Sequence, residues 1–157
     1  MFRKKQQPTP ADIALPDNWP NRLTIKAAAA AIPTETADLA DLLQWLAGHE
    51  RCTLTLTRGE PGPRGSRGHT SRTPDGLTIA VPPHANGVML TNATLHQVAH
   101  ILVGTSTQPC RYANLGQLTG DQRTAEEDAE LTATVITAHH LMRSKPPTLP
   151  QTFVPQG

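Results

Sequence analysis

Two histidines, His96 and His100, are the residues whose types and spacing first suggest chemistry. They stand four positions apart in the segment 91–103, where apolar residues predict a largely buried helix that ends at Gly104. Residues at i and i+4 share one face of a helix, about one turn apart, so both imidazoles could bind a single ion. Histidines at this spacing form half of many zinc sites, although the same pair also occurs as surface or hydrogen-bonded core residues.

A cluster of acidic residues lies near the start of the last predicted helix, over 121–143. The favourable interaction of acids with the positive end of the helix dipole explains part of this cluster. At about 100° per residue, Asp128 falls at the centre of the apolar arc of this helix. Glu126 and Glu130 point away from that arc, and Glu127 lies at its edge.

A carboxylate that faces the core is costly unless it is paired or binds a metal ion. Asp128 is the acid that the helical pattern directs inward, and the histidine pair lies on another helix. We therefore predict that His96, His100 and Asp128 hold one metal ion and leave a fourth position open.

The elements that position these residues must come from the middle of the 157-residue chain, because its fifteen prolines gather mainly in two terminal segments and one loop. Residues 1–20 combine prolines with charge, so we expect a mobile N-terminal arm. Four prolines in 144–157 exclude a helix or a central strand, so we expect a disordered proline-rich tail. One foldable domain remains over 21–143.

The remaining patterns predict the order helix, helix, strand, strand, helix, helix. These elements are placed at 21–32, 34–48 (with Thr34 or Thr36 as the cap and Gly48 as the stop), 52–58, 76–82, 91–103 and 121–143. This order indicates a small α+β domain with two or three short strands packed on helices, rather than a parallel α/β fold. The segment 59–74, rich in Gly, Pro, Ser and Arg, is predicted to be a loop. The second strand, GLTIAVP, is a candidate sheet edge.

Composition and charge exclude several classes of protein. No run of apolar residues is long enough for a transmembrane helix, and the basic N-terminus lacks the apolar run of a secretory signal. Cys52 and Cys110 cannot form a disulfide framework and lack the spacing of a metal knuckle. A net charge of +1 argues against a mainly electrostatic nucleic-acid binder. We expect a reduced, cytoplasmic protein.

The run TLHQVAHILVG, followed by AEEDAELTATVI, resembles the ImmA/IrrE-type metallopeptidases, and the resemblance extends over roughly residues 35–143. That family has a His-Glu-x-x-His helix and, near the start of a later helix, an acid followed by Ala and then Asp, Asn or Glu. Asp128, Ala129 and Glu130 fit the later motif. The resemblance implies a zincin-like fold, a bound Zn²⁺, and a protein substrate or partner such as a repressor or antitoxin, or a role as the toxin component of such a pair.

Two departures from the family pattern bear on activity. Gln97 stands at the position of the glutamate that takes a proton during catalysis, and an amide cannot act as a general base. The chain is therefore expected to bind zinc better than it hydrolyses peptides, whether Gln97 is an engineered Glu-to-Gln change or marks a pseudoenzyme. The third ligand is Asp128 where the family usually has Glu, and Glu127 is the alternative ligand. Tyr112 is a candidate for stabilising an oxyanion beside the metal, or a packing residue.

Two other functions stay open. The first is a non-catalytic protein-interaction module that keeps the same scaffold, which Gln97 favours. The second is nucleic-acid binding through arginines at or within the long loop, namely Arg58, Arg64, Arg67 and Arg72. This loop has no aromatic residue on which a base could stack, so a solvated loop is the simpler interpretation and nucleic-acid binding is not favoured.

Overall fold

The computed structural model describes residues 22–36, 38–60, 68–105, 120–140 and 146–156. Within these residues, the chain forms four helices and a four-stranded mixed sheet. The helices are α1 (Arg22–Ala31), α2 (Leu39–Glu50), α3 (Gly87–Val103) and α4 (Gly120–His140). The strands are β1 (Leu54–Arg58), β2 (His69–Thr73), β3 (Gly76–Val81) and β4 (Gln151–Phe153). The predicted α+β class is confirmed, and the sheet has more strands than the two or three predicted.

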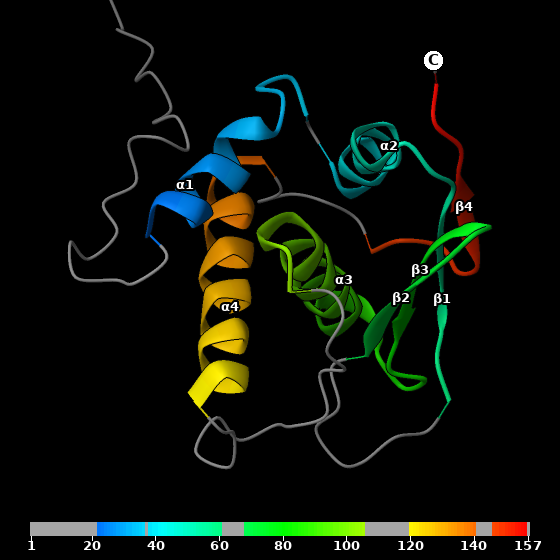
Figure 1. The fold of residues 1–157 in the computed structure, drawn as a ribbon. Helices are drawn as coiled ribbons and strands as arrows, with labels where there is room; N and C mark the ends of the chain where they lie inside the picture. The colour runs from blue at the N-terminus through cyan, green and yellow to red at the C-terminus, as the bar shows by residue number, and fades with distance from the viewer. Residues whose placement is uncertain (1–21, 37, 61–67, 106–119, 141–145, 157) are drawn as a thin grey trace, which may run out of the picture.

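The helices and the sheet are arranged around α3 (Figure 1). α3 lies between α4 and the sheet, where it contacts β2 and β3. α1 packs against α4 and α3 on the side away from the sheet, whereas α2 packs against β1 and β4. The helix that carries the histidine pair is therefore covered on both sides.

The sheet has the strand order β2-β3-β1-β4. β1 and β3 are parallel, with Leu54 opposite Leu77, and β2 pairs antiparallel with β3. GLTIAVP, predicted to be a sheet edge, is therefore an internal strand, and β2 occupies that edge. The sequence predicts a loop at β2 because the segment 59–74 is rich in Gly, Pro, Ser and Arg. In the structure, the strand residues HTSRT are largely exposed and show no apolar alternation. Backbone pairing on one side holds an edge strand, so it needs no apolar face.

A tight turn at Pro74 and Asp75 joins β2 to β3, and Gly76 is the first residue of β3. Gly76 has φ +140°, and a Cβ at this position would collide with the carbonyl oxygen of Thr53. The same carbonyl accepts a hydrogen bond from the Leu77 amide at 2.8 Å. Glycine therefore lets the hairpin approach the residue before β1 closely, which aligns the two parallel strands.

The helix α2 begins and ends differently from its prediction. Asp38 is its N-cap and accepts a hydrogen bond from a backbone amide of the first turn at 2.8 Å, so neither Thr34 nor Thr36 caps the helix. The helix also continues past Gly48 and ends where Arg51 adopts the left-handed conformation, with φ 55°. A glycine inside a helix lowers the stability of the helix only modestly, so apolar contacts on both sides of Gly48 are enough to keep this turn helical.

Apolar side chains gather in two clusters. The main core lies between α2, the sheet and α3, and the buried residue that α4 adds to it is Ile136. Other members of the main core include Leu42, Leu46, Leu56, Ile79 and Val98. A second, smaller cluster joins α1 to α4 through Ile25, Ala29 and Val135. α4 thus contributes to both clusters, with Ile136 in the first and Val135 in the second.

The segment 144–157, predicted to be a disordered tail, contributes a strand. Residues 151–153 form β4, which pairs antiparallel with β1 at the edge of the sheet. Phe153 is buried in the main core, and the Gln44 side chain donates a hydrogen bond to the Val154 carbonyl at 2.7 Å. The tail prediction is wrong for these residues, because prolines that flank a short edge strand do not interrupt its hydrogen-bond ladder.

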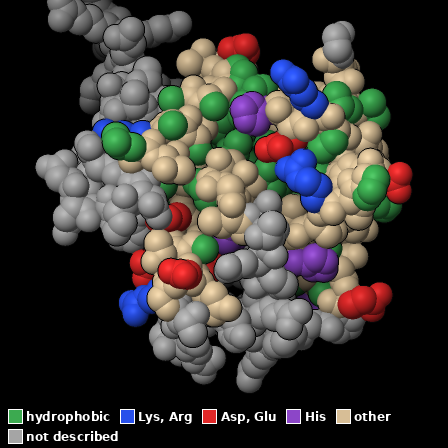
Figure 2. Space-filling view, viewed as in Figure 1, with side chains coloured by type: hydrophobic (Ala, Val, Ile, Leu, Met, Phe, Trp, Pro, Cys, Tyr) green, Lys and Arg blue, Asp and Glu red, His purple; other side chains and the backbone are tan. Residues whose placement is uncertain are grey.

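No helix in the described part of the chain is long and apolar enough to cross a membrane. On the face shown in Figure 2, the described basic side chains lie apart from one another and do not form a continuous patch. The predicted mobile arm over 1–20 lies outside the described residues, as do Arg64 and Arg67.

Candidate metal centre

The histidine pair lies on a buried face of α3. This helix begins at Gly87, earlier than predicted, and it ends as predicted at Gly104, whose φ of 80° is left-handed. His96 and His100 are each 1% exposed, and their ring centroids are 4.7 Å apart. The predicted shared helix face is therefore confirmed, and the two Nε2 atoms lie 3.1 Å apart.

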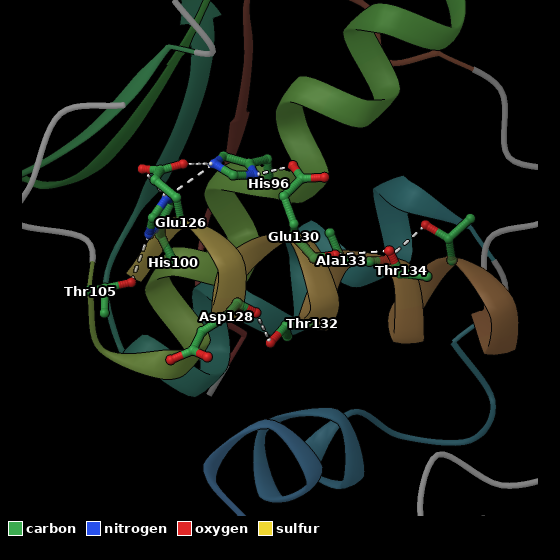
Figure 3. Close-up of polar contacts among 10 residues, drawn as sticks. His96, His100, Thr105, Glu126, Asp128, Glu130, Thr132, Ala133 and Thr134 are labelled. Carbon is green, nitrogen blue, oxygen red and sulfur yellow. Dashed lines mark hydrogen bonds and ion pairs between the residues drawn. The ribbon is translucent and has the colours of Figure 1, made fainter. Parts of the chain in front are cut away.

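A carboxylate from α4 faces both histidines. Glu126 Oε2 lies 2.8 Å from His96 Nε2, and Glu126 Oε1 lies 3.2 Å from His100 Nε2 (Figure 3). One ligand atom from each of the three residues falls within 4.8 Å of the others, so this group could hold a metal ion. The histidines lie on α3 and Glu126 lies on α4, so the group also links these two helices.

The Nδ1 atoms of both histidines, on the side of each ring away from Glu126, also have hydrogen-bond partners. His96 Nδ1 lies 2.6 Å from Glu130 Oε1, and His100 Nδ1 lies 2.7 Å from Thr105 Oγ1. Thr105 is itself fixed at the end of α3, because its amide donates to the His100 carbonyl at 2.8 Å. The Glu130 carboxylate accepts from His96 Nδ1 and keeps the proton on that nitrogen, which leaves the Nε2 lone pair of His96 for a metal ion. The Thr105 hydroxyl can accept from His100 Nδ1 in the same way.

Protons alone cannot satisfy all three contacts among the Nε2 atoms and an ionised Glu126. If both Nε2 atoms carry a proton, their N–H groups face each other at 3.1 Å. If only one carries a proton, the other Nε2 presents a lone pair to a carboxylate oxygen 2.8 or 3.2 Å away. A cation among the three side chains removes this conflict, because each ligand atom then directs a lone pair at it. The donor chemistry of the group therefore fits a metal ion.

Asp128, the predicted third ligand, is not a member of this group. It is 4% exposed, so the prediction that it is buried is confirmed, but its side chain points away from the histidines (Figure 3). Glu127, the alternative ligand, is partly exposed and accepts a hydrogen bond from Arg123 Nε at 2.9 Å along the same helix. The structure thus brings neither of these acids to the histidine pair, and it brings Glu126 instead.

The helical pattern does not identify Glu126 because α4 has two inward faces. α4 packs against α1 as well as α3, so its buried positions do not fall on a single arc. The prediction that Glu126 points away from the core is therefore wrong. Ala129 is buried and Ala133 packs against the main core, and both share a helix face with Glu126 at i+3 and i+7. This row of small residues, which allows close helix packing, is the signal that could have identified Glu126.

Gln97, the next residue along α3, is buried against β2. It is 1% exposed, and its Oε1 accepts a hydrogen bond from the Thr70 hydroxyl at 3.0 Å. The residue at the predicted general-base position is thus a neutral amide that the edge strand holds in place. Tyr112, the predicted oxyanion-stabilising residue, and Cys110 lie outside the described residues.

Comparisons of this chain with family models, with curated proteins and with solved structures found no match. In the described part of the chain, His96, His100 and Glu126 form the one group of three potential ligands with suitable spacing. The fold and the site together define a small α+β protein with a candidate metal centre between two helices.

Proposed function

We propose that the chain is a zinc-binding, zincin-like protein of the metallopeptidase type, with His96, His100 and Glu126 as its ligands. The observation that supports this is the convergence of their ligand atoms from two helices at 2.8 to 3.2 Å. Two atoms that bind one tetrahedral zinc ion at about 2.0–2.1 Å lie about 3.3 Å apart. The three side chains would therefore need only small movements to accept the ion.

The donor set favours zinc among common divalent cations. Imidazole nitrogens suit zinc and other transition metals, whereas Mg²⁺ and Ca²⁺ prefer oxygen ligands alone. Three protein ligands leave a fourth position open, as in catalytic zinc sites. A zinc ion bound there would supply a Lewis acid for a peptide carbonyl.

The amide of Gln97 limits peptide hydrolysis at this centre, because it stands where a general base is needed. A peptidase needs a group beside the metal that takes a proton, and an amide has no basic site at neutral pH. We therefore propose that the chain binds zinc and a protein partner of the repressor or antitoxin kind, with hydrolysis impaired at Gln97. The exposed β2 edge, which pairs on one side only within the described residues, is where an extended segment of that partner could add a strand.

The zinc content of protein purified without added metal tests the first part of this proposal. We expect about one Zn²⁺ per chain by plasma mass spectrometry, and one site when chelator-treated protein is titrated with zinc. Zinc at 100 times its Kd should raise the free energy of unfolding by about 2.7 kcal/mol. A metal-free preparation whose Tm does not respond to zinc would contradict the proposal.

A second candidate is a non-catalytic protein-interaction module on the same scaffold, which the buried amide of Gln97 favours. The variant Gln97→Glu separates the two candidates. If the chain is a peptidase with an impaired base, Gln97→Glu should cleave members of a mixed peptide library, and a chelator should abolish the cleavage. The control Gln122→Glu makes the same change on α4 and should cleave nothing. A Gln97→Glu variant that binds zinc and cleaves no peptide favours the interaction module.

A further inference from the structure

The first half of α4 offers α3 little apolar surface. Among residues 120–130, the buried ones are two alanines and two acids, namely Ala125, Ala129, Glu126 and Asp128. Alanine buries one methyl group, so this half of the helix gains little from the hydrophobic effect. Its polar contacts with α3 include those of Glu126 and Glu130 with the histidines.

The second half of α4 is attached differently. Ile136 enters the main core, and Val135 joins the small cluster with Ile25 and Ala29 of α1. α1 packs against α4 and α3 and makes no comparable contact with the sheet or α2. α1 packs more extensively against α4 than against α3, so its position depends in part on how α4 is docked, although Ile32 just after α1 enters the main core that α2, the sheet and α3 share.

Charge within the first half of α4 adds to this weakness. Four acids fall within positions 126–130, and Glu126 and Glu130 stand at i and i+4, a spacing at which like charges destabilise a helix. The ion pair between Arg123 and Glu127 lies on a different, partly exposed part of the helix. A divalent cation beside Glu126 would offset the charge of this segment and connect it to α3.

We propose that occupation of the His96–His100–Glu126 centre by a divalent cation controls the docking of the first half of α4, and of α1 with it, onto α3. The sheet, α2 and α3 form a core that does not require the ion. This inference rests on the proposed zinc site, and it assigns that site a role in metal-dependent ordering of the α1–α4 layer. The chain would thereby couple zinc availability to the shape of one face of the molecule.

Hydrogen exchange of the full chain, measured by mass spectrometry with and without Zn²⁺, tests this inference. Chelator-treated protein is compared with the same sample at saturating zinc, and calorimetry on that sample measures binding independently. We expect zinc to slow exchange about tenfold or more in peptides covering 120–132 and 22–31. In β1 and β3 the change should be less than about twofold, because their opening does not release the ion.

Matched variants of α4 complete the experiment. Glu126→Gln should lose the zinc-dependent protection of 120–132, whereas Glu127→Gln should keep it. Zinc that binds by calorimetry but slows exchange uniformly, or not at all in α4, overturns the inference and leaves the proposed zinc site intact. Absence of binding by calorimetry overturns both.

Discussion

The Nε2 atoms of His96 and His100 lie 3.1 Å apart, and both face the carboxylate of one acid on another helix. Two imidazole nitrogens this close repel each other unless a proton or a cation lies between them. Because Glu130 and Thr105 hold the two Nδ1 atoms, neither ring is placed to relieve the repulsion by turning. With the Nδ1 atoms held in this way, the two Nε2 atoms and the Glu126 carboxylate face one another, and a cation bound among them would remove the repulsion.

Removal of one imidazole should abolish tight zinc binding. We expect His100→Ala to weaken zinc affinity about 100-fold or more, because the ion loses one of three protein ligands. His84→Ala is the control, since His84 is an exposed histidine in the turn before α3. Titration of zinc against a competing chelator measures both constants. An affinity of His100→Ala within about threefold of the original protein would contradict the ligand assignment.

Variants of two acids on α4 distinguish Glu126, the third ligand that the structure indicates, from Asp128, the third ligand that the helical pattern predicts. Glu126→Gln should lower zinc affinity about 100-fold, because an amide is a poor zinc ligand and carries no charge. Asp128→Asn should leave zinc affinity within about threefold, since this side chain points away from the histidines (Figure 3). The same competition titration measures both variants. The reverse ranking would restore Asp128 as the third ligand.

The carboxylate at the outer nitrogen of His96 should tune the centre without being a ligand. Glu130→Gln keeps an acceptor near His96 Nδ1 but removes the charge, so zinc affinity should fall about 10- to 100-fold. Glu127→Gln is a matched control on the same helix and should have little effect, because Glu127 contacts Arg123. The Co²⁺ absorption spectrum of Glu130→Gln should still report histidine ligation. Unchanged affinity in Glu130→Gln would show that the 2.6 Å contact does not support the ion.

The helix that carries the histidine pair was predictable because its signals are local. Apolar residues over 91–103 determine a buried helix, the i and i+4 spacing places both rings on one face, and Gly104 ends the helix with a left-handed residue. None of these properties depends on where the other elements lie. The pair and its burial therefore follow from the sequence.

The third member of the group was not predictable in the same way. A helical wheel assumes one inward face, but α4 lies against both α1 and α3. Asp128 and Glu126 are both buried, on different sides of the helix, and only the packing of three helices decides which acid meets the histidines. The tertiary arrangement, rather than the periodicity of one segment, sets the site.

The missed strands have a related cause. β2 is a polar edge strand, and β4 is a three-residue strand between prolines, so neither carries the alternation that identifies a strand in sequence. Each exists because a neighbouring strand offers it backbone hydrogen bonds. Pairing of this kind is a property of the assembled sheet.

The last strand should contribute measurably to the stability of the fold. Phe153 is 5% exposed and packs in the main core, so Phe153→Ala should lower the free energy of unfolding by about 3 kcal/mol. Val154→Ala is the control, because its side chain is 59% exposed and should change stability by less than about 0.5 kcal/mol. Urea denaturation followed by tryptophan fluorescence measures both. A disordered tail would make the two variants equally neutral, and that result would contradict the pairing of β4 with β1.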